Sequence, residues 1–434
     1  MTKLFIQNSN LKYHHQLAAE LLQCVKASGS SQQKSANALK FPKLCHELST
    51  EILTNTYQPY SYHHFAITEP KLREIYAPAF RDRIAQMWIA LQMAPIMENQ
   101  FIDDTYANRK GKGTLAAIAK VQKLMRQPRH TWGLQLDIYS YFNSINKKEL
   151  LTQLYNLIYN SNLSALRQYC LANLIEKIIE QDATKLQNER TGNQYLLNQI
   201  PLHKKLQFNN TQQVGLPIGS VTSQLFGNFY LNNLDHEIKH TLKVKGYVRY
   251  MDDLFILSDS PEKLQQWKEH IEWYLTSHLQ LKLHPTKVHL APIEEGFDYL
   301  GFRVFPHYKH IRKTTISSLK ERLRYFNSIL DSGATSVFLK SRPSRGRWSK
   351  NGIHYAPFYT QLKAMQSTIN SYYGLLSQAN HCQLRKQIYH KNFGELKRYL
   401  LPNNGYYNHF TIKKGLHFNK MAPDTLCWPE TQDA

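Results

Sequence analysis

Most of the chain carries apolar residues at the spacing of amphipathic helices. Leu17, Leu21 and Val25 recur every fourth residue, which places them on one face of a helix. A Gly/Ser/Gln-rich stretch, SGSSQQKS, interrupts this pattern, which resumes at Leu44. The spacing predicts helices over residues 11–57, 80–100, 115–125, 150–180, 221–240 and 261–278, and mostly helix after residue 305.

Short apolar runs bounded by turn residues predict strands between these helices. The clearest run is YVRYMDDLFIL, in which two apolar arms flank an Asp-Asp pair and predict a β-hairpin over 247–258. The other strands are predicted within 57–76 and at 132–138, 279–283, 288–291 and 297–305. Three polar segments are predicted to be loops: the basic, Gly-punctuated 106–114, the irregular 181–213 and the basic 340–350.

The composition narrows the range of functions. Apolar residues make up 42% of the chain and aromatic residues 12%, values typical of a folded protein. The formal net charge of +22 favours a polyanionic partner, of which nucleic acid is the commonest. Residues 301–434 contain 21 Lys and Arg but only 6 Asp and Glu, so one end is strongly cationic. Charge alone leaves open a basic protein without such a partner.

The cysteines and the N-terminal segment argue against disulfide-bonded, zinc-ribbon, secreted and membrane-spanning proteins. The five cysteines are far apart and form no CxxC pair, which argues against a disulfide framework and a zinc ribbon. The N-terminal MTKLFIQNSNLKYHH has no apolar core of a signal peptide, and no run of 18 apolar residues occurs. We therefore expect a cytoplasmic protein that does not span a membrane.

The candidate chemistry begins with the acidic residues of the 247–258 hairpin. Asp252 and Asp253 lie between apolar arms, where a carboxylate must be solvated, paired or metal-bound. Taken alone, the pair also fits an ordinary Asp-rich turn. A second acid, Asp137, ends the apolar run LQLD and is the only carboxylate between Trp132 and Lys148. Two strands that deliver acids to one sheet edge would form an oxygen-rich site suited to Mg²⁺.

Four motifs in order make the chain resemble reverse transcriptases. They are LDIYSYFNSI, GLPIGSVTSQLFGNFYLNNLD, YVRYMDDLFIL and FDYLGF, and the upstream PKLREIYAPAFRDRI resembles the fingers of bacterial members. The resemblance covers residues 65–305, with a weaker similarity to about residue 393. It implies an α+β right-hand polymerase fold and RNA-directed DNA synthesis by phosphoryl transfer with two Mg²⁺ ions, for which Mn²⁺ can substitute.

The resemblance also implies catalytic roles for individual residues. Asp137, Asp252 and Asp253 would be the metal-binding acids, and the backbone carbonyl of Ile138 would be a further metal ligand. Lys287 matches the lysine proposed to protonate pyrophosphate, although His284 and His289 are close in sequence.

The substrate-binding roles follow from the same motifs. Phe142 would be the aromatic steric gate that excludes a 2′-hydroxyl and so favours dNTPs over ribonucleotides. The other nucleotide-binding candidates are Arg109, Lys110 and Lys112 of the 106–114 loop, together with Gln224. The template- and primer-binding candidates are Gly215, Pro217, Gly219, Ser223, Tyr250, Met251, Leu300, Gly301, Arg385 and Lys386.

The resemblance implies a division of the chain into fingers, palm and thumb. Arg385 and Lys386 are predicted to lie on the exposed face of an amphipathic helix pair in a basic thumb that follows the template–primer backbone. The predicted layout is a helical N-terminal region at 1–65, fingers at 66–130 and 150–213, a palm at 131–149 and 214–305, and a thumb at 306–434.

The turn GLPIGSVTSQ indicates a subgroup. With YMDD and the RKGKGT loop it most resembles enzymes of diversity-generating retroelements, which copy a template-repeat RNA and work with a small accessory protein. Ser220 and Val221 depart from that group, where Asn and Leu are common. A related antiphage-defence enzyme that copies an adjacent non-coding RNA is the alternative. In both cases the partners would be an RNA template, a DNA or RNA primer and dNTPs. The intact acids argue against a non-catalytic RNA-binding scaffold.

Overall fold

The computed structural model describes residues 2–28, 40–68, 71–185, 193–206, 213–331, 358–379, 381–403 and 405–413. The chain divides into two compact units. The first comprises Met1–Gly296 and Phe305–His307, and the second comprises Phe297–Val304 and Tyr308–Ala434. The predicted basic loop at 340–350 and parts of 181–213 lie outside the described residues.

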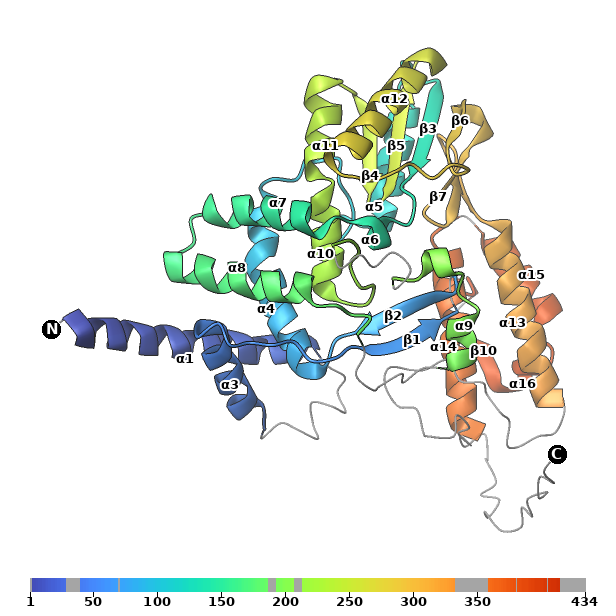
Figure 1. The fold of residues 1–434 in the computed structure, drawn as a ribbon. Helices are drawn as coiled ribbons and strands as arrows, with labels where there is room; N and C mark the ends of the chain where they lie inside the picture. Colours follow the sequence, from blue (N-terminus) through green and yellow to red (C-terminus); the bar gives the residue numbers. More distant parts are fainter. Residues whose placement is uncertain are drawn as a thin grey trace, which may run out of the picture. The chain divides into compact units, whose positions relative to one another are not determined.

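The first unit opens with helices and a short hairpin (Figure 1). The helical pattern predicted at 11–57, on either side of the Gly/Ser/Gln-rich stretch, corresponds to α1 (Thr2–Ser28) and α3 (Phe41–Leu53), which contact each other. The strands predicted within 57–76 are β1 (His63–Ile67) and β2 (Arg73–Ala77), an antiparallel pair. The helix α4 (Phe80–Glu98) then packs against α1 and against the later α10.

The helices of the 140–241 region are shorter than the sequence pattern predicted. Asn146 and Ser164 accept hydrogen bonds from backbone N–H groups three residues later, so each starts a separate helix. The elements are α6 (Tyr141–Ser144), α7 (Lys147–Tyr159), α8 (Ala165–Glu180), α9 (Gln194–Asn198), the 3₁₀ turn η2 (Leu202–Lys204), α10 (Val221–Tyr230), α11 (Asn232–His236) and the π-helical η4 (Glu237–Thr241).

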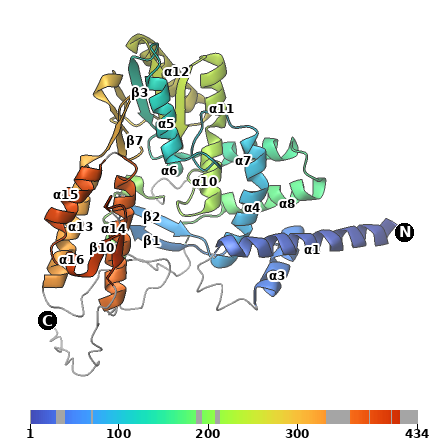
Figure 2. The same cartoon turned by 180° about the vertical axis from the view of Figure 1, so that it is seen from behind.

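A four-stranded antiparallel sheet forms the centre of the first unit. Its strand order is β4-β5-β3-β6, with β4 at Gly246–Tyr250, β5 at Asp253–Ser258, β3 at Trp132–Asp137 and β6 at His289–Pro292. The helix α12 (Pro261–His278) covers one face and α5 (Thr114–Met125) the other (Figures 1 and 2). Successive residues of β5, Leu254 to Leu257, are therefore all buried, because side chains alternate between the two faces.

Most predicted strands are confirmed, and one is wrong. The hairpin predicted at 247–258 is β4 and β5, and the strand predicted at 132–138 is β3. Residues 279–283 form no strand; only Leu283 makes an isolated bridge, to Ile138. The segment instead runs along the residues after Asp137, where Tyr139 N–H donates to the Lys282 carbonyl over 2.9 Å.

The second unit combines a small sheet with basic helices. The strands β7 (Phe297–Tyr299), β8 (Phe302–Val304) and β9 (Lys309–Ile311) form an antiparallel sheet. The helix pair predicted at 371–389 belongs to α14 (Phe358–Leu376) and α15 (Cys382–Asn392). The remaining elements are η5 (Ile293–Glu295) at the end of the first unit and, in the second, α13 (Lys313–Asp331), α16 (Leu396–Tyr399), β10 (Leu400–Pro402) and β11 (Phe410–Ile412).

Two further sequence expectations concern thiols and membranes. Cys24, Cys45 and Cys170 are buried free thiols, and Cys382 is an exposed one. Burial raises the pKa of the Cys24, Cys45 and Cys170 thiols to about 11, so these three side chains are apolar packing groups at neutral pH. Among the described helices, none has the length and apolar character needed to cross a bilayer.

Candidate active site

Strand pairing brings the three predicted metal acids to one edge of the central sheet. Asp137, the last residue of β3, lies directly opposite Asp253, the first residue of β5. Asp253 in turn pairs with Tyr250, the last residue of β4. Met251 and Asp252 are therefore the two-residue loop of the hairpin. The register that buries the apolar arms on both faces thus also fixes Asp137 and Asp253 at the strand ends, with Asp252 in the loop next to Asp253.

The hairpin loop has a strained residue next to its acid. Met251 has a φ of +55°, in the left-handed region that side chains other than Gly rarely adopt. Two-residue hairpin loops need such a conformation to match the strand twist, and Gly or Asn usually provides it. A non-Gly residue held there costs on the order of 1–3 kcal/mol, so surrounding contacts must stabilise the turn. Tyr250, on the strand before it, accepts a hydrogen bond at its hydroxyl from Thr114 over 3.2 Å.

The carboxylates repel one another, and a lysine offsets part of that repulsion. Burial, followed by the charge of Asp137, raises the pKa of Asp252 to about 6, while the positive charges of Lys287 and Arg73 act in the opposite direction. Lys287 Nζ lies 2.9 Å from Asp137 Oδ2 and forms an ion pair with it. A cation bound between Asp137 and Asp252 would remove this repulsion.

The donor set fits a divalent cation that also binds substrate. Within the described ranges, no three or more His, Cys, Asp or Glu side chains come together in a group that could hold a metal ion. Mg²⁺ is usually held by one or two carboxylates together with water and substrate phosphates, which is what Asp137 and Asp252 offer. The backbone of Asp137 and Tyr139 bonds to residues 284 and 282, so the carbonyl of Ile138 between them is directed away from that segment.

The predicted steric gate packs on a helix glycine. Phe142 follows β3 in α6, and its ring lies against Gly227 of α10. A Cβ added to Gly227 would lie only 2.9 Å from Cε1 of Phe142. The neighbouring Tyr141 donates its hydroxyl hydrogen to the Gly227 carbonyl. The position of the Phe142 ring is therefore determined by the absence of a side chain at residue 227.

The turn predicted to lie beneath the template packs tightly against other backbone. Gly215 has a φ of +95° and Gly219 one of +130°. A Cβ on Gly219 would meet the Tyr76 carbonyl at 2.6 Å, and Tyr76 N–H donates to the Ile218 carbonyl over 2.7 Å. Gly215 and Gly219 are among the predicted template- and primer-binding residues, a role that stays a prediction. The structure provides a different reason for them, which is the packing of the turn on β2 and on residue 143.

The residues after this turn differ in exposure. Ser223 is 4% exposed, and its backbone N–H and hydroxyl both contact the Ser220 hydroxyl, which caps α10. Its template-binding role stays a prediction, and Ser223 acts here within the helix cap. Gln224 is exposed, so its side chain is available to a ligand.

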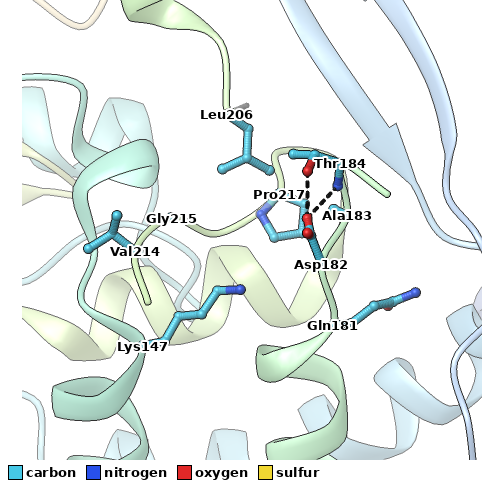
Figure 3. Close-up of a pocket in the computed structure, with 9 residues that line it drawn as sticks. All are labelled: Lys147, Gln181, Asp182, Ala183, Thr184, Leu206, Val214, Gly215 and Pro217. Carbon is cyan, nitrogen blue, oxygen red and sulfur yellow. Dashed lines mark hydrogen bonds between the residues drawn. The ribbon is translucent and has the colours of Figure 1, made fainter. Parts of the chain in front are cut away.

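A small pocket lies behind the same turn, apart from the three acids. Figure 3 shows the Lys147 side chain directed into it, and it is lined by Lys147, Gln181, Asp182, Ala183, Thr184, Leu206, Val214, Gly215 and Pro217. Asp182 accepts hydrogen bonds from Thr184 N and Oγ1 at 2.9 and 2.6 Å. Burial lowers the pKa of Lys147, and Asp182 and Glu180 oppose that shift.

The basic 106–114 loop uses two of its three cations internally. The Arg109 side chain is 6% exposed and donates to Glu98 and to the carbonyls of Ile102 and Thr105. Lys112 Nζ lies 2.6 Å from Asp103 Oδ1, whereas Lys110 is exposed. Nucleotide binding by Arg109 and Lys112 stays a prediction that would require these contacts to be exchanged.

In the second unit, one predicted position is wrong. Arg385 was expected on an exposed face but is 6% exposed. Its Nε and Nη1 donate to the carbonyls of Tyr406 and Leu376, at 3.0 and 3.1 Å, because the end of α14 leaves acceptors without helical partners. Lys386 is exposed as predicted. Leu300 and Gly301 form the two-residue turn between β7 and β8, with φ values of +47° and +91°.

Sequence reasoning missed two arginines near the acids. Arg73, on β2, is exposed, and its charge lowers the pKa of Asp252. Arg73 lies in the PKLREIY segment, which the sequence analysis assigned to the fingers, but the sequence pattern did not predict that it lies near the hairpin. Arg249, on β4, is fully buried and donates to the Met251 carbonyl over 3.0 Å. A charged residue within the apolar run YVRY was the signal that could have identified it.

Comparison with known proteins decides the family. The model of the reverse transcriptase (RNA-dependent DNA polymerase) family matches residues 68–304, more than half of the chain, including both strands that carry the acids. The chain belongs to the reverse transcriptase family. This confirms the predicted fold class, α+β with an antiparallel sheet of the right-hand polymerase type, and the predicted enzyme class, RNA-directed DNA polymerase.

Individual relatives are distant. "Protein YkfC" of Escherichia coli (strain K12) is 24% identical over 294 residues, which are 59% of this chain and 70% of that protein. Telomerase of Candida albicans, solved with a fragment of telomeric RNA, aligns with a TM-score of 0.37 and 11% identity over 78% of this chain and 60% of its own. Apo telomerase of Candida tropicalis aligns with the same TM-score and identity, over 62% and 60%. The assignment to the reverse transcriptase family rests on the family model.

Proposed function

We propose that this reverse transcriptase copies a non-coding RNA by phosphoryl transfer at the edge of the β4-β5-β3-β6 sheet. The observation that supports this most directly is the pairing of Asp137 with Asp253 beside the Met251–Asp252 loop. Asp137 and Asp252 would hold divalent metal, with Asp253 contributing to a second ion or its water shell. Two such ions supply Lewis-acid stabilisation of the attacking 3′-hydroxyl and of the leaving pyrophosphate.

The remaining residues of the site would transfer a proton, exclude ribonucleotides and contact the incoming nucleotide or the template. Lys287, 2.9 Å from Asp137 Oδ2, would hold a proton at Nζ and release it to pyrophosphate. The Phe142 ring, packed on Gly227, would exclude nucleotides that carry a 2′-hydroxyl. Gln224 and Lys110 are exposed and would contact the incoming nucleotide or the template.

The proposed biological role is template-repeat copying in a diversity-generating retroelement, with a small accessory protein. The support is the turn GLPIGSVTSQ together with YMDD and the RKGKGT loop. Ser220, at the position where that group commonly has Asn, caps α10 by accepting from Ser223 N–H over 3.0 Å. Both Ser and Asn are favourable helix caps, so this departure preserves the local structure.

The first experiment is to purify the chain with its co-expressed cellular RNA, supply Mg²⁺ and labelled dNTPs, and sequence the product. DNA complementary to a single co-purified RNA is the expected result. Errors concentrated at adenines along a template repeat would support diversification. A repetitive cDNA, or one copied from an adjacent non-coding RNA without such errors, would replace that role with antiphage defence.

A matched pair of variants controls this experiment. Changing Asp252 and Asp253 together to Ala should abolish DNA synthesis and leave RNA binding nearly intact. Asp259→Ala removes a carboxylate from just beyond the opposite end of β5, where Asp259 forms an exposed ion pair with Lys263, and should leave synthesis unchanged. Continued synthesis by the double variant would refute the metal assignment.

A further inference from the structure

The side chain of Arg249 lies buried directly beneath the catalytic hairpin. Arg249 belongs to β4 and is completely inaccessible to solvent. Its Nε lies 2.7 Å from Asp235 Oδ1 and its Nη2 lies 2.5 Å from Asp235 Oδ2, so the pair is bidentate. Asp235, in α11, is also fully buried. A charge in this position is tolerated only with a complete set of partners.

The other guanidinium hydrogens of Arg249 have partners as well. Nη1 donates to Asn228 Oδ1 and to the Met251 carbonyl, each over 3.0 Å. Nη2 donates to the Asn228 carbonyl, also over 3.0 Å. A guanidinium has five N–H donors in a fixed planar arrangement, and five acceptors surround this one. Asp235 and Asn228 therefore fix the orientation from which Arg249 reaches the hairpin loop.

The acceptor in the loop is the peptide that precedes Asp252. Met251 is the residue in the left-handed conformation, and its carbonyl belongs to the peptide group that leads into Asp252. Rotation of this peptide would change the direction in which the Asp252 carboxylate points. The hydrogen bond from Arg249 is donated by a charged group, which is stronger than one between neutral groups, and it offsets the strain of the turn.

We propose that Arg249 is a positioning residue for catalysis. Held by Asp235 and Asn228, it fixes the Met251 peptide and thereby aims the Asp252 carboxylate at its metal site. This inference rests on the proposed function, because it assigns Asp252 to metal binding. A small displacement of a catalytic group reduces the rate strongly, by about 100-fold for roughly 1 Å.

Replacing Arg249 and Asp235 together can distinguish a role in positioning Asp252 from a role in stabilising the fold. A buried ion pair replaced as a whole by uncharged groups often costs little stability, whereas removal of one partner leaves a buried charge. The backbone of Arg249 also holds the start of the 106–114 loop, since its carbonyl accepts from Tyr106 N–H over 2.9 Å. Replacing only the side chain keeps that bond. The loop and dNTP binding should then remain while the orientation of Asp252 is lost.

The test uses two matched double variants. Arg249→Met with Asp235→Asn removes the pair beneath the hairpin. Arg81→Met with Asp82→Asn removes a buried Arg–Asp pair at the start of α4, in which Asp82 also accepts the Tyr57 hydroxyl at 2.7 Å. Arg81 also pairs with Glu51, so this control removes at least as much charge pairing as the test variant. Asp235 likewise accepts from the Tyr247 hydroxyl at 2.7 Å. For each protein we would measure the Tm, kcat, the KM for dNTP and, without substrate, Mn²⁺ binding by electron paramagnetic resonance.

We expect the Arg249/Asp235 variant to bind Mn²⁺ about 10-fold more weakly and to lose about 100-fold in kcat, with the KM for dNTP within about 3-fold. The Arg81/Asp82 variant should match the wild type in Mn²⁺ binding and kcat. Wild-type Mn²⁺ binding and kcat in the Arg249/Asp235 variant, or equal losses in both variants, would overturn the proposal.

A single substitution covers the case in which the double variant does not fold. Arg249→Lys keeps a positive charge beside Asp235, but one ammonium cannot reproduce the planar set of donors to Asn228 and Met251. It should fold and show the same weakened Mn²⁺ binding, and unchanged binding would count against the proposal. If the wild type makes no DNA, the proposed function fails, and the Mn²⁺ comparison still tests whether Arg249 orders Asp252.

Discussion

The catalytic hairpin and the basic 106–114 loop show how differently acidic and basic residues are placed in this chain. In the hairpin, strand register sets Asp137 opposite Asp253, and the two-residue loop next to Asp253 adds Asp252 at the same end of the sheet. In the loop, Arg109 and Lys112 fold back onto Glu98 and Asp103. A carboxylate at the end of a buried strand has a position determined by the apolar residues before it. A long cationic side chain in a loop reaches whichever acceptor lies within its length.

The largest effect is expected from changing a strand-end acid without changing its shape. Asp137→Asn keeps the volume of the side chain and its place opposite Asp253 but removes the charge that is proposed to bind metal and that pairs with Lys287. DNA synthesis should fall by at least about 1,000-fold, since metal-ion stabilisation of the transition state is worth several kcal/mol. Single-turnover dNTP incorporation measures this loss. RNA binding, followed by fluorescence anisotropy, should remain, and a variant with more than a tenth of wild-type synthesis would contradict the assignment.

A smaller effect, on sugar selectivity, is expected from changing Phe142, the predicted steric gate. Phe142→Val should raise the ratio of ribonucleotide to deoxyribonucleotide incorporation by roughly 10- to 100-fold, the range for removing a steric contact of this size. Gly227→Ala should also raise this ratio, because the new methyl group would lie only 2.9 Å from Cε1 of Phe142 and would displace the ring. Competition between the two nucleotides at one template position measures the ratio.

The control for the glycine is another helix glycine. Gly374, in α14, has no neighbouring atom within 4 Å of an added Cβ, so Gly374→Ala should leave selectivity unchanged. If Phe142→Val and Gly227→Ala both leave the ratio unchanged, Phe142 is a packing residue and not the gate.

The same contrast explains what could be predicted from the sequence. The hairpin and the strand ending at Asp137 follow from apolar runs interrupted by charge, and both are confirmed. The metal-binding role of their acids stays a prediction. The burial of Arg385 could not be predicted. Its guanidinium donates hydrogen bonds to the carbonyls of Leu376 and Tyr406, which only the folded chain brings near. The strand predicted at 279–283 failed because an apolar run without a full-length neighbour cannot form a ladder.

The next effect distinguishes the exposed Lys110 of the 106–114 loop from the enclosed Arg109. Lys110→Gln should raise the KM for dNTP by about 3- to 10-fold with an unchanged Tm, since the exposed amine is proposed to contact the triphosphate and is not needed by the fold. Arg109→Gln should instead lower the Tm by several degrees, because Glu98 and two carbonyls lose their donors. Steady-state kinetics and thermal melts on both variants provide the comparison. A large KM effect of Arg109→Gln at constant Tm would support the predicted nucleotide-binding role of Arg109.

The smallest effect concerns Lys147, a buried cation near the template turn whose amine projects into the pocket of Figure 3. Because burial lowers its pKa from the ordinary 10.5, with Asp182 and Glu180 opposing, the folded chain binds fewer protons than the unfolded chain below pH 10.5. The free energy of unfolding should therefore rise with pH between the folded-state pKa and 10.5. Lys147→Met removes this component and should stabilise the fold near neutral pH by about 1–3 kcal/mol, an advantage that shrinks as the pH approaches 10.5.

Urea unfolding at several pH values measures this difference in the free energy of unfolding, and Lys148→Met, a change at the exposed neighbouring residue, is the control. A Lys147→Met variant less stable than wild type at neutral pH would show that the amine stabilises the turn as an ion, and the contrast with the paired cations of the 106–114 loop would not hold.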